Sequence, residues 1–239
     1  MTRTRIGLLL AATHLSLLAL ACGSSGGGDE PPPAPAHTPA SIDDAFWTEL
    51  CGVVPARVPS RLGERVPAWE AYRELDGEAA RARACSPGRS WMDAASGLYR
   101  MALLAAEAHD DATFVRYIRQ AALDLADPVS IAKLAQIEYQ GIGPTDEEPS
   151  SPVLVARDRG LAYAHIRASH ELAEAERRAT GDNRLLTMVV GATLGRFDWY
   201  GTPAGRAEYD PEANATEVQT RVTEIIARFE LVHGALPAR

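Results

Sequence analysis

The chain has 239 residues, 46% of them hydrophobic and 6% aromatic, and its formal net charge at neutral pH is −8. An acidic chain without a block of basic residues is poorly suited to binding nucleic acid, because such binding depends on neutralising phosphates. The chain also lacks the polybasic cluster that would attract it to an anionic membrane surface. Because aromatic side chains are few, alanine and leucine must fill most of a core, which suits closely packed helices.

The first 21 residues predict a secretory signal peptide. The start, MTRTR, is basic, and residues 6–21 form a mostly apolar run that is shorter than the ~20 residues a membrane-spanning helix needs. The run ends in Ala19-Leu20-Ala21-Cys22, which resembles a bacterial lipobox. The resemblance implies that Cys22 becomes the first residue of the mature protein and carries lipid. The alternative is an ordinary cleaved signal peptide followed by an incidental cysteine.

Residues 22–40 predict a lipidated cysteine followed by a flexible tether. The stretch GSSGGGDEPPPAPAHTPA at 23–40 joins a glycine-rich coil to a proline-rich part that favours polyproline II. Fully extended, this stretch would reach about 60 Å. Gly23 stands where an aspartate would favour the inner membrane in enteric bacteria, so the outer membrane is favoured. We therefore expect a protein of the bacterial cell envelope, held at the outer membrane by its N-terminal lipid.

The two remaining cysteines, Cys51 and Cys85, predict a disulfide within an N-terminal helical cap at residues 41–90. Exported chains meet an oxidising compartment, in which paired cysteines form disulfides. Two buried free thiols are the alternative. A metal site is not expected, because no histidine lies between or near the two cysteines.

From Ser41 onward, the spacing of apolar residues predicts an all-α protein without strands. Ser41 is suited to cap the first helix, and Pro67 opens a polar helix that contains Gly77. Residues 183–200 are apolar nearly all round, which predicts burial by several neighbours. The joints are mostly short and favour antiparallel helix pairs, although residues 144–152 and 201–211 predict longer loops. The later predicted helices are 91–108, 111–126, 128–140, 155–179, 183–200 and 215–233.

A repeated pattern connects these helices. In LAQIEYQGIG at 134–143, Gly141 follows Leu134 by the same distance at which Gly201 follows Leu194. Both sites predict a helix that ends at a left-handed glycine. The pattern resembles the Sel1-like repeat, a helical hairpin related to the tetratricopeptide repeat. The resemblance implies that residues 91–239 form antiparallel helical hairpins stacked as a short α-solenoid with a C-terminal capping helix. It also implies an adaptor role in protein assemblies.

The sequence predicts no catalytic motif, metal site or cofactor. His165 and His170 are five residues apart, about 140° around a helix, whereas histidines that bind one metal from a helix are four apart. The acidic loop at 146–148 lacks the alternating ligands and the glycine of a calcium loop. The sequence GATLG at 191–195 is interpreted as small residues at which helices touch.

Two further features have two interpretations each. Trp199, Tyr200 and Tyr209 gather around the predicted loop at 201–211, and they are either a binding patch or residues buried under the terminal helix. Asn214 formally matches a glycosylation acceptor, but it is more simply the cap of the last helix.

Three functions are compatible with these patterns. The first is a non-enzymatic adaptor that binds another envelope protein or a peptide in a groove; the second is a structural subunit of an envelope complex; the third is an enzyme with an unrecognised site. We favour the adaptor, because no catalytic groups cluster in the sequence and the repeat resemblance agrees with it. If a groove exists, the inner faces of first helices should line it. The candidate partner-binding residues are Lys133, Gln136, Tyr139, Gln140 and Arg167.

Overall fold

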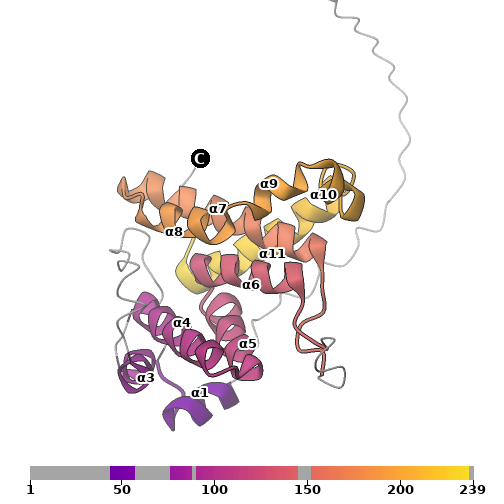
Figure 1. Cartoon of the computed structure of the whole chain (residues 1–239). Coiled ribbons are helices and arrows are strands. Elements are labelled where there is room, and N and C mark those ends of the chain that lie inside the picture. The colour runs from indigo at the N-terminus through magenta and orange to yellow at the C-terminus, as the bar shows by residue number, and fades with distance from the viewer. Residues whose placement is uncertain (1–43, 57–75, 88–89, 145–151, 237–239) are drawn as a thin grey trace, which may run out of the picture. The chain divides into compact units, whose positions relative to one another are not determined.

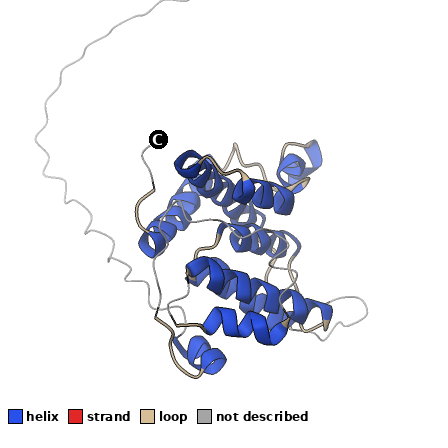
Figure 2. Cartoon of the chain, turned by 90° about the vertical axis from the view of Figure 1, so that its left-hand side faces the viewer, coloured by secondary structure: helices blue, strands red, loops and turns tan. Residues whose placement is uncertain are grey.

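The computed structural model describes residues 44–56, 76–87, 90–144 and 152–236, and all of these residues lie in the unit that spans Thr38–Arg239. Within them the protein is all-α, as predicted, and the only β-type pairing is an isolated bridge between Ile142 and Val155 (Figure 2). The predicted signal peptide, Cys22, the tether, Pro67 and the loop at 146–148 lie outside the described residues. No helix in the described part of the chain is both long and apolar enough to cross a membrane.

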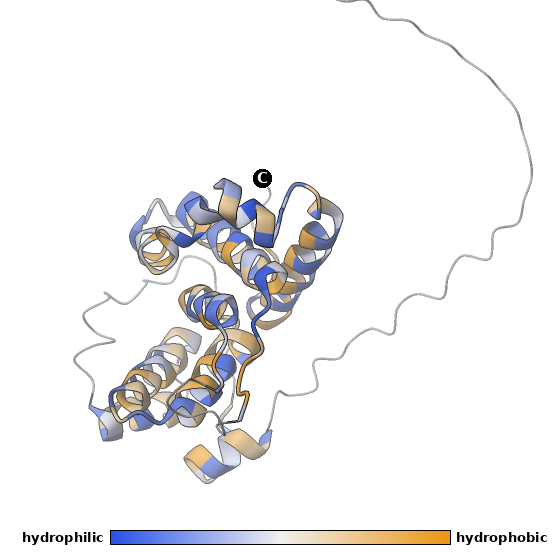
Figure 3. Ribbon diagram, turned by 45° about the vertical axis from the view of Figure 1, so that its right-hand side comes forward, coloured by the Kyte–Doolittle hydropathy of each residue, from blue (hydrophilic) through white to orange (hydrophobic). Residues whose placement is uncertain are grey.

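The helices follow one another in the order shown in Figure 1. Hydrophobic and hydrophilic residues are interspersed along the helices (Figure 3), and the longer helices bury one apolar side. The elements are α1 (Asp44–Cys51), α3 (Gly77–Cys85), α4 (Trp91–Glu107), α5 (Asp111–Arg119), the π-helix η1 (Gln120–Asp124), α6 (Pro128–Gln140), α7 (Arg159–Thr180), α8 (Arg184–Thr193), α9 (Arg196–Tyr200), α10 (Pro203–Glu208) and α11 (Ala215–His233).

The N-terminal cap consists of α1 and α3 packed against α4. The predicted disulfide between Cys51 and Cys85 is present and joins these two helices. α3 begins at Gly77 because the carboxylate of Asp76 caps it, accepting a hydrogen bond from the Ala79 backbone N–H at 2.7 Å. The prediction of a helix that continues through Gly77 was therefore wrong.

The middle of the chain contains a backbone irregularity that the sequence did not predict. The predicted helix 111–126 is α-helical only to Arg119 and then widens into η1. The chain leaves η1 through Ala126, a non-glycine residue with a φ of 51°. Asp127 then caps α6 and Pro128 occupies its first turn, as predicted for Pro128. π-Helical turns and positive φ values at non-glycine residues are strained, so the surrounding structure must hold this segment in place.

The connection from α6 to α7 is fixed at both ends. Gly141 ends α6 with a φ of 75°, in agreement with the predicted glycine end. Asp158 caps α7 by accepting a hydrogen bond from the Leu161 N–H at 2.8 Å, and its own N–H donates to the Glu138 carbonyl oxygen at 2.9 Å. α7 then packs against α6, α8 and α11.

The predicted helix 183–200 is divided in two. α8 ends at Thr193, and Gly195 adopts a φ of 76° before α9 begins. Gly201, predicted to be the left-handed glycine, has a φ of −76° instead, and the left-handed glycine is Gly195, which precedes it by almost two helical turns. Part of the predicted loop 201–211 forms α10. The last helix, in contrast, has the predicted bounds 215–233.

Candidate functional site

The predicted partner-binding face on α6 is largely covered by α8. Gln136 donates a hydrogen bond from Nε2 to the Ala192 carbonyl oxygen of α8. Lys133 Nζ lies 3.1 Å from Gln136 Oε1, and burial lowers the pKa of Lys133 from its ordinary value. Tyr139 is only 7% exposed. Three of the five predicted residues therefore act in packing between helices.

The other two predicted residues lie at the surface. Gln140 is exposed and lines a hollow of about 500 Å³ with residues of the 141–144 and 153–157 segments. Arg167 pairs with Glu171 one turn further along α7, at 3.2 Å. The structure therefore does not bring the five residues together into one open groove.

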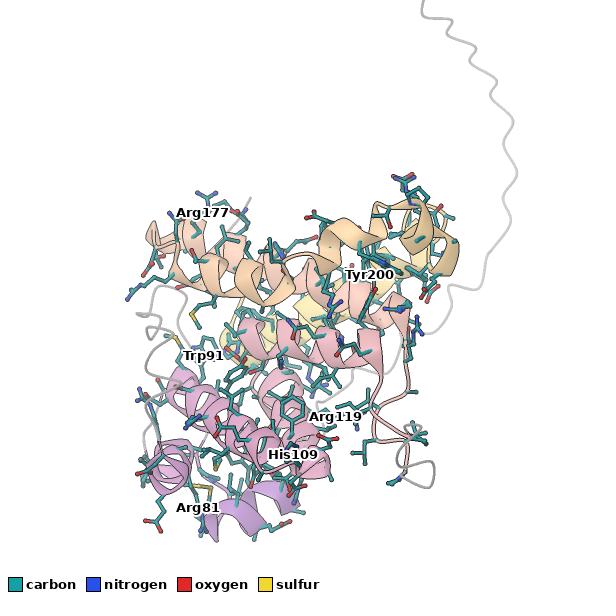
Figure 4. The ribbon with its side chains drawn as sticks, viewed as in Figure 1. Arg81, Trp91, His109, Arg119, Arg177 and Tyr200 are labelled. Carbon is teal, nitrogen blue, oxygen red and sulfur yellow. A yellow bond between two sulfur atoms is a disulfide. The ribbon has the colours of Figure 1, made fainter. Side chains whose placement is uncertain are left out.

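An aromatic cluster lies where α6, α7 and α9 meet. The Tyr139 ring centroid is 5.2 Å from that of Trp199 and 5.9 Å from that of Tyr200, both in edge-to-face geometry. Tyr200 is 2% exposed, its hydroxyl donates to the Arg159 carbonyl oxygen at 2.9 Å, and burial raises its pKa (Figure 4). Tyr209 is partly buried and packs against the small apolar cluster between α7 and α11. Of the two interpretations of these aromatic residues, burial applies to Tyr200.

Arg159, which the sequence did not single out, is central to this cluster. Its guanidinium carbon lies 3.4 Å from the Tyr139 ring centroid and 4.9 Å from that of Trp199. Its Nη2 is 2.9 Å from Glu208 Oε2, whereas its buried Nε and Nη1 have no hydrogen-bond partner. The aromatic faces therefore stabilise a buried cation by cation–π interaction. Arg157 pairs with the same oxygen of Glu208, so two arginines share one carboxylate oxygen.

A further arginine adjoins the cluster on its solvent side. The guanidinium carbon of Arg196 is 5.0 Å from the Tyr139 ring centroid, and the residue is partly exposed. Among the described residues, no carboxylate is within ion-pair distance of Arg196. Arg159 and Arg196 thus approach one tyrosine ring, and only Arg159 has a carboxylate partner there.

Next to Arg196 the protein exposes three large apolar side chains, which we call the α8–α9 patch. Val190 is 38% exposed, Leu194 is 75% exposed and Phe197 is 42% exposed. A Cβ atom built at Gly191 or Gly195 would meet nothing within 4 Å, so the backbone there is also open. The interpretation of 191–195 as small residues at which helices touch was wrong for Gly191 and Gly195, and the predicted burial of 183–200 does not extend to Val190, Leu194 and Phe197.

Phe197 is held in a fixed orientation from one side. Its ring stacks on Tyr163, with centroids 5.5 Å apart and an interplanar angle of 14°, and it lies 5.7 Å from the ring of His170. His170 is itself held by Thr193, with 2.7 Å between Nε2 and Oγ1. One side of the Phe197 ring is therefore supported by neighbouring rings, and the residue as a whole is 42% exposed.

The two histidines considered as metal ligands have separate partners. His165 is buried, and its Nδ1 lies 2.7 Å from Glu138 Oε2. His170 is half-buried against Thr193, and burial lowers its pKa. Within the residues that the structure describes, there is no group of three or more side chains that could hold a metal ion.

A second polar cluster surrounds η1. Asp124 is 4% exposed and accepts hydrogen bonds from Trp47 Nε1 at 2.6 Å and Gln120 Nε2 at 2.8 Å. From α11, Arg228 donates to the Leu123 carbonyl oxygen and His233 Nε2 donates to that of Leu125 at 2.6 Å. One signal was available in the sequence, because Gln120 and Asp124 have the spacing of a hydrogen-bonded pair on a helix. This cluster stabilises the irregular backbone and exposes nothing to a ligand.

Comparisons with known proteins add no assignment. No family model matches the chain, and neither the curated proteins nor the solved structures contain a match. The geometry of the α8–α9 patch and its arginine is thus the basis for the function proposed below.

Proposed function

We propose that the protein is a lipid-anchored, non-enzymatic adaptor of the bacterial cell envelope that binds a protein partner through the α8–α9 patch. The observation that carries the proposal is the exposure of Val190, Leu194 and Phe197, three large apolar side chains close together in sequence at the junction of α8 and α9. Single exposed apolar residues are ordinary, whereas neighbouring ones on a rigid support are typical of interaction sites. The lipobox-like sequence ending at Cys22 and the tether that follows it support attachment at the outer membrane.

The order of packing supports placing this surface on stacked helical hairpins of the Sel1-like type. α4 packs against α5, and α6 packs against α7, so consecutive helices form neighbouring pairs. A hairpin cannot cover its own apolar side, and it therefore needs the next one along the chain. In this arrangement Gln136 and Tyr139 of α6 support the patch from behind, through Ala192 and Trp199.

The docking proposal can be tested by photo-crosslinking in the cells that produce the protein. A benzophenone amino acid is introduced at Leu194, in the patch, or at Leu231, which is 57% exposed on α11. We expect a discrete crosslinked protein from position 194 and none from position 231. Equal crosslinking from both positions, or none from position 194, would contradict the patch as a docking site. Stoichiometric co-purification of the crosslinked protein in detergent would instead indicate a permanent complex.

The anchor is tested separately at the N-terminus. Mass spectrometry of the mature protein should find Cys22 as the first residue with attached acyl chains. A Cys22→Ser variant should lose membrane association, because stable anchoring depends on more than one acyl chain. An unmodified Cys22, or a Cys22→Ser variant that stays with the membrane, would refute lipid anchoring and leave the patch proposal intact.

A further inference from the structure

The α8–α9 patch offers contact area that is already ordered. Leu194 and Phe197 are the most exposed of its members, and Phe197 is stacked on Tyr163. A partner would therefore bury apolar area without paying to order the aromatic ring, which favours binding. An apolar segment of a partner would therefore cover this part of the surface.

The positive charge of Arg196 beside the patch indicates which residue types that partner segment should contain. Arg157 and Arg159 already share one oxygen of Glu208, and Arg196 has no ion-pair partner among the described residues. The nearest acidic residue in sequence, Asp198, is two positions away on α9 and so faces another side of the helix. The chain as a whole is acidic, with a net charge of −8, so an unpaired arginine beside an apolar surface is a local exception. A carboxylate supplied by the partner would complement it.

An anionic membrane surface is a poorer fit to the same features. Each basic residue near such a surface contributes only about 1 kcal/mol, and Arg196 is a single unpaired cation on an acidic chain. A guanidinium instead forms a directional, hydrogen-bonded pair with one carboxylate. Because it is weakly hydrated, it loses little solvation free energy when apolar groups pack beside it.

We propose that the α8–α9 patch binds a peptide segment in which apolar side chains are accompanied by an aspartate or glutamate, and that Arg196 pairs with that carboxylate. This inference rests on the proposed function, because it presumes that the patch is a docking site. It goes further in specifying the partner's chemistry and the residue that recognises it.

The experiment is a selection from a random heptapeptide display library on the full chain held in nanodiscs of zwitterionic lipid. Parallel selections use Arg196→Gln and the patch variant Leu194→Ser/Phe197→Ser. Arg177→Gln is the matched control, because Arg177 lies in the last turn of α7, at the end of that helix that is far from Tyr200 of α9 (Figure 4). Circular dichroism verifies that each variant is folded. The best peptide, and its analogue with glutamine and asparagine in place of the acids, are then titrated by fluorescence anisotropy.

The wild type and Arg177→Gln should enrich peptides that combine apolar and acidic residues. Arg196→Gln should bind the best peptide about fivefold more weakly, as expected for a partly exposed ion pair, and should not distinguish it from its amide analogue. Apolar peptides without acidic residues, bound equally by Arg196→Gln, would overturn the inference and leave docking at the patch standing. No enrichment over the patch variant would overturn both proposals. Arg196-dependent binding to phosphatidylglycerol vesicles, with no peptide enriched, would overturn the inference in favour of a membrane surface.

Discussion

The N-terminal cap and the α8–α9 segment are both made of short helices, but different interactions hold them in place. α1 and α3 are joined by the Cys51–Cys85 disulfide. Trp47 is fully buried, and its indole N–H donates a hydrogen bond to the Asp124 carboxylate. α8 and α9 are held without a disulfide, by the hydrogen bond from Gln136 and by the aromatic cluster around Arg159.

The two regions also differ in what they leave exposed. Among its described residues, the cap turns the aromatic side chains of Phe46 and Trp47 inward and exposes Val53 and Val54, which follow α1. α8–α9 exposes Leu194 and Phe197 although Thr193 and Tyr200 on either side are buried. Exposure in α8–α9 is therefore not a consequence of loose attachment. The disulfide and the buried tryptophan suit the cap to a role in stability, whereas contact with a partner is the role proposed for the patch.

The largest effect is expected from Trp47→Ala in the cap. The substitution removes a fully buried ring and a hydrogen bond to the buried Asp124, which should lower the free energy of unfolding by about 3–5 kcal/mol. Urea denaturation followed by circular dichroism measures the change. Trp199→Ala, in the half-buried part of the aromatic cluster, is the matched control and should cost less. An equal or larger loss from Trp199→Ala would reverse the comparison.

The next effect is expected from replacing both Cys51 and Cys85 with serine. The disulfide joins residues 34 positions apart, and its loss should lower the free energy of unfolding by about 2–4 kcal/mol, because the unfolded chain gains freedom. A reducing agent should destabilise the wild type to the same extent and leave the double variant unchanged. Crosslinking from position 194 should persist under native conditions. Its disappearance would show that the cap and the patch are coupled.

Arg159→Ala breaks the support of α9. It removes a cation stacked on Tyr139 and paired with Glu208, and we expect a loss of about 2 kcal/mol, typical of a desolvated cation–π contact. Arg159→Met, which keeps the packing of the aliphatic stem, tests whether charge is responsible. If the methionine variant were as stable as the wild type, the guanidinium would contribute nothing. Crosslinking from position 194 should weaken in both variants.

The pH dependence of stability should reveal His233. Burial lowers the pKa of His233 to about 4 in the folded protein, against about 6.5 in an unfolded chain. Between these values the unfolded chain binds more protons, so the contribution of neutral His233 is complete above pH 6.5 and is lost as the pH falls toward 4. Burial raises the pKa of Asp127 to about 6, which acts in the opposite direction between pH 6 and 4.

Comparison with His233→Gln cancels the contribution of Asp127, which both proteins share. Urea denaturation measures the free energy of unfolding of both proteins. As the pH is lowered from 6.5 to 4, this free energy should fall more for the wild type than for the variant. A difference that stays constant over this range would show that His233 titrates normally.

The smallest effect concerns Lys133, the only lysine in the chain. Burial lowers the pKa of Lys133. We expect Lys133→Met to change the free energy of unfolding by no more than about 0.5 kcal/mol. After dimethylation with ¹³C, NMR titration of this single side chain should give a pKa below that of the same protein unfolded in urea. Identical values in the two states would contradict the burial of Lys133 beside Gln136 and Phe114.

The sequence predicted those features that depend on local periodicity or on simple chemistry. The bounds of α11 were predicted correctly because Val218, Val222 and Phe229 recur on one face and are buried. The disulfide followed from two cysteines in a chain expected to be exported. The helix end at Gly141 was predicted because a glycine at the C-terminus of a helix adopts positive φ without steric cost.

The rest depends on tertiary context. An uninterrupted apolar run at 183–200 has no polar side to mark its solvent-facing residues, so neither the break at Gly195 nor the exposure of Leu194 could be seen. An α-helix and η1 share nearly the same apolar spacing over five residues. Tyr139 was expected in an open groove because its burial depends on Trp199 and Arg159, which approach from later elements.

The η1 segment has a consequence for synthesis of the chain. The carbonyl groups of Leu123 and Leu125 receive their hydrogen bonds from residues 105 and 108 positions later in the chain. A growing polypeptide therefore reaches its middle long before the partners of these carbonyls exist, and contacts of such separation form slowly. The hydrogen bonding around η1 can therefore be completed only once the last helix has been made, whereas the core between α1, α3 and α4 needs no residue of that helix.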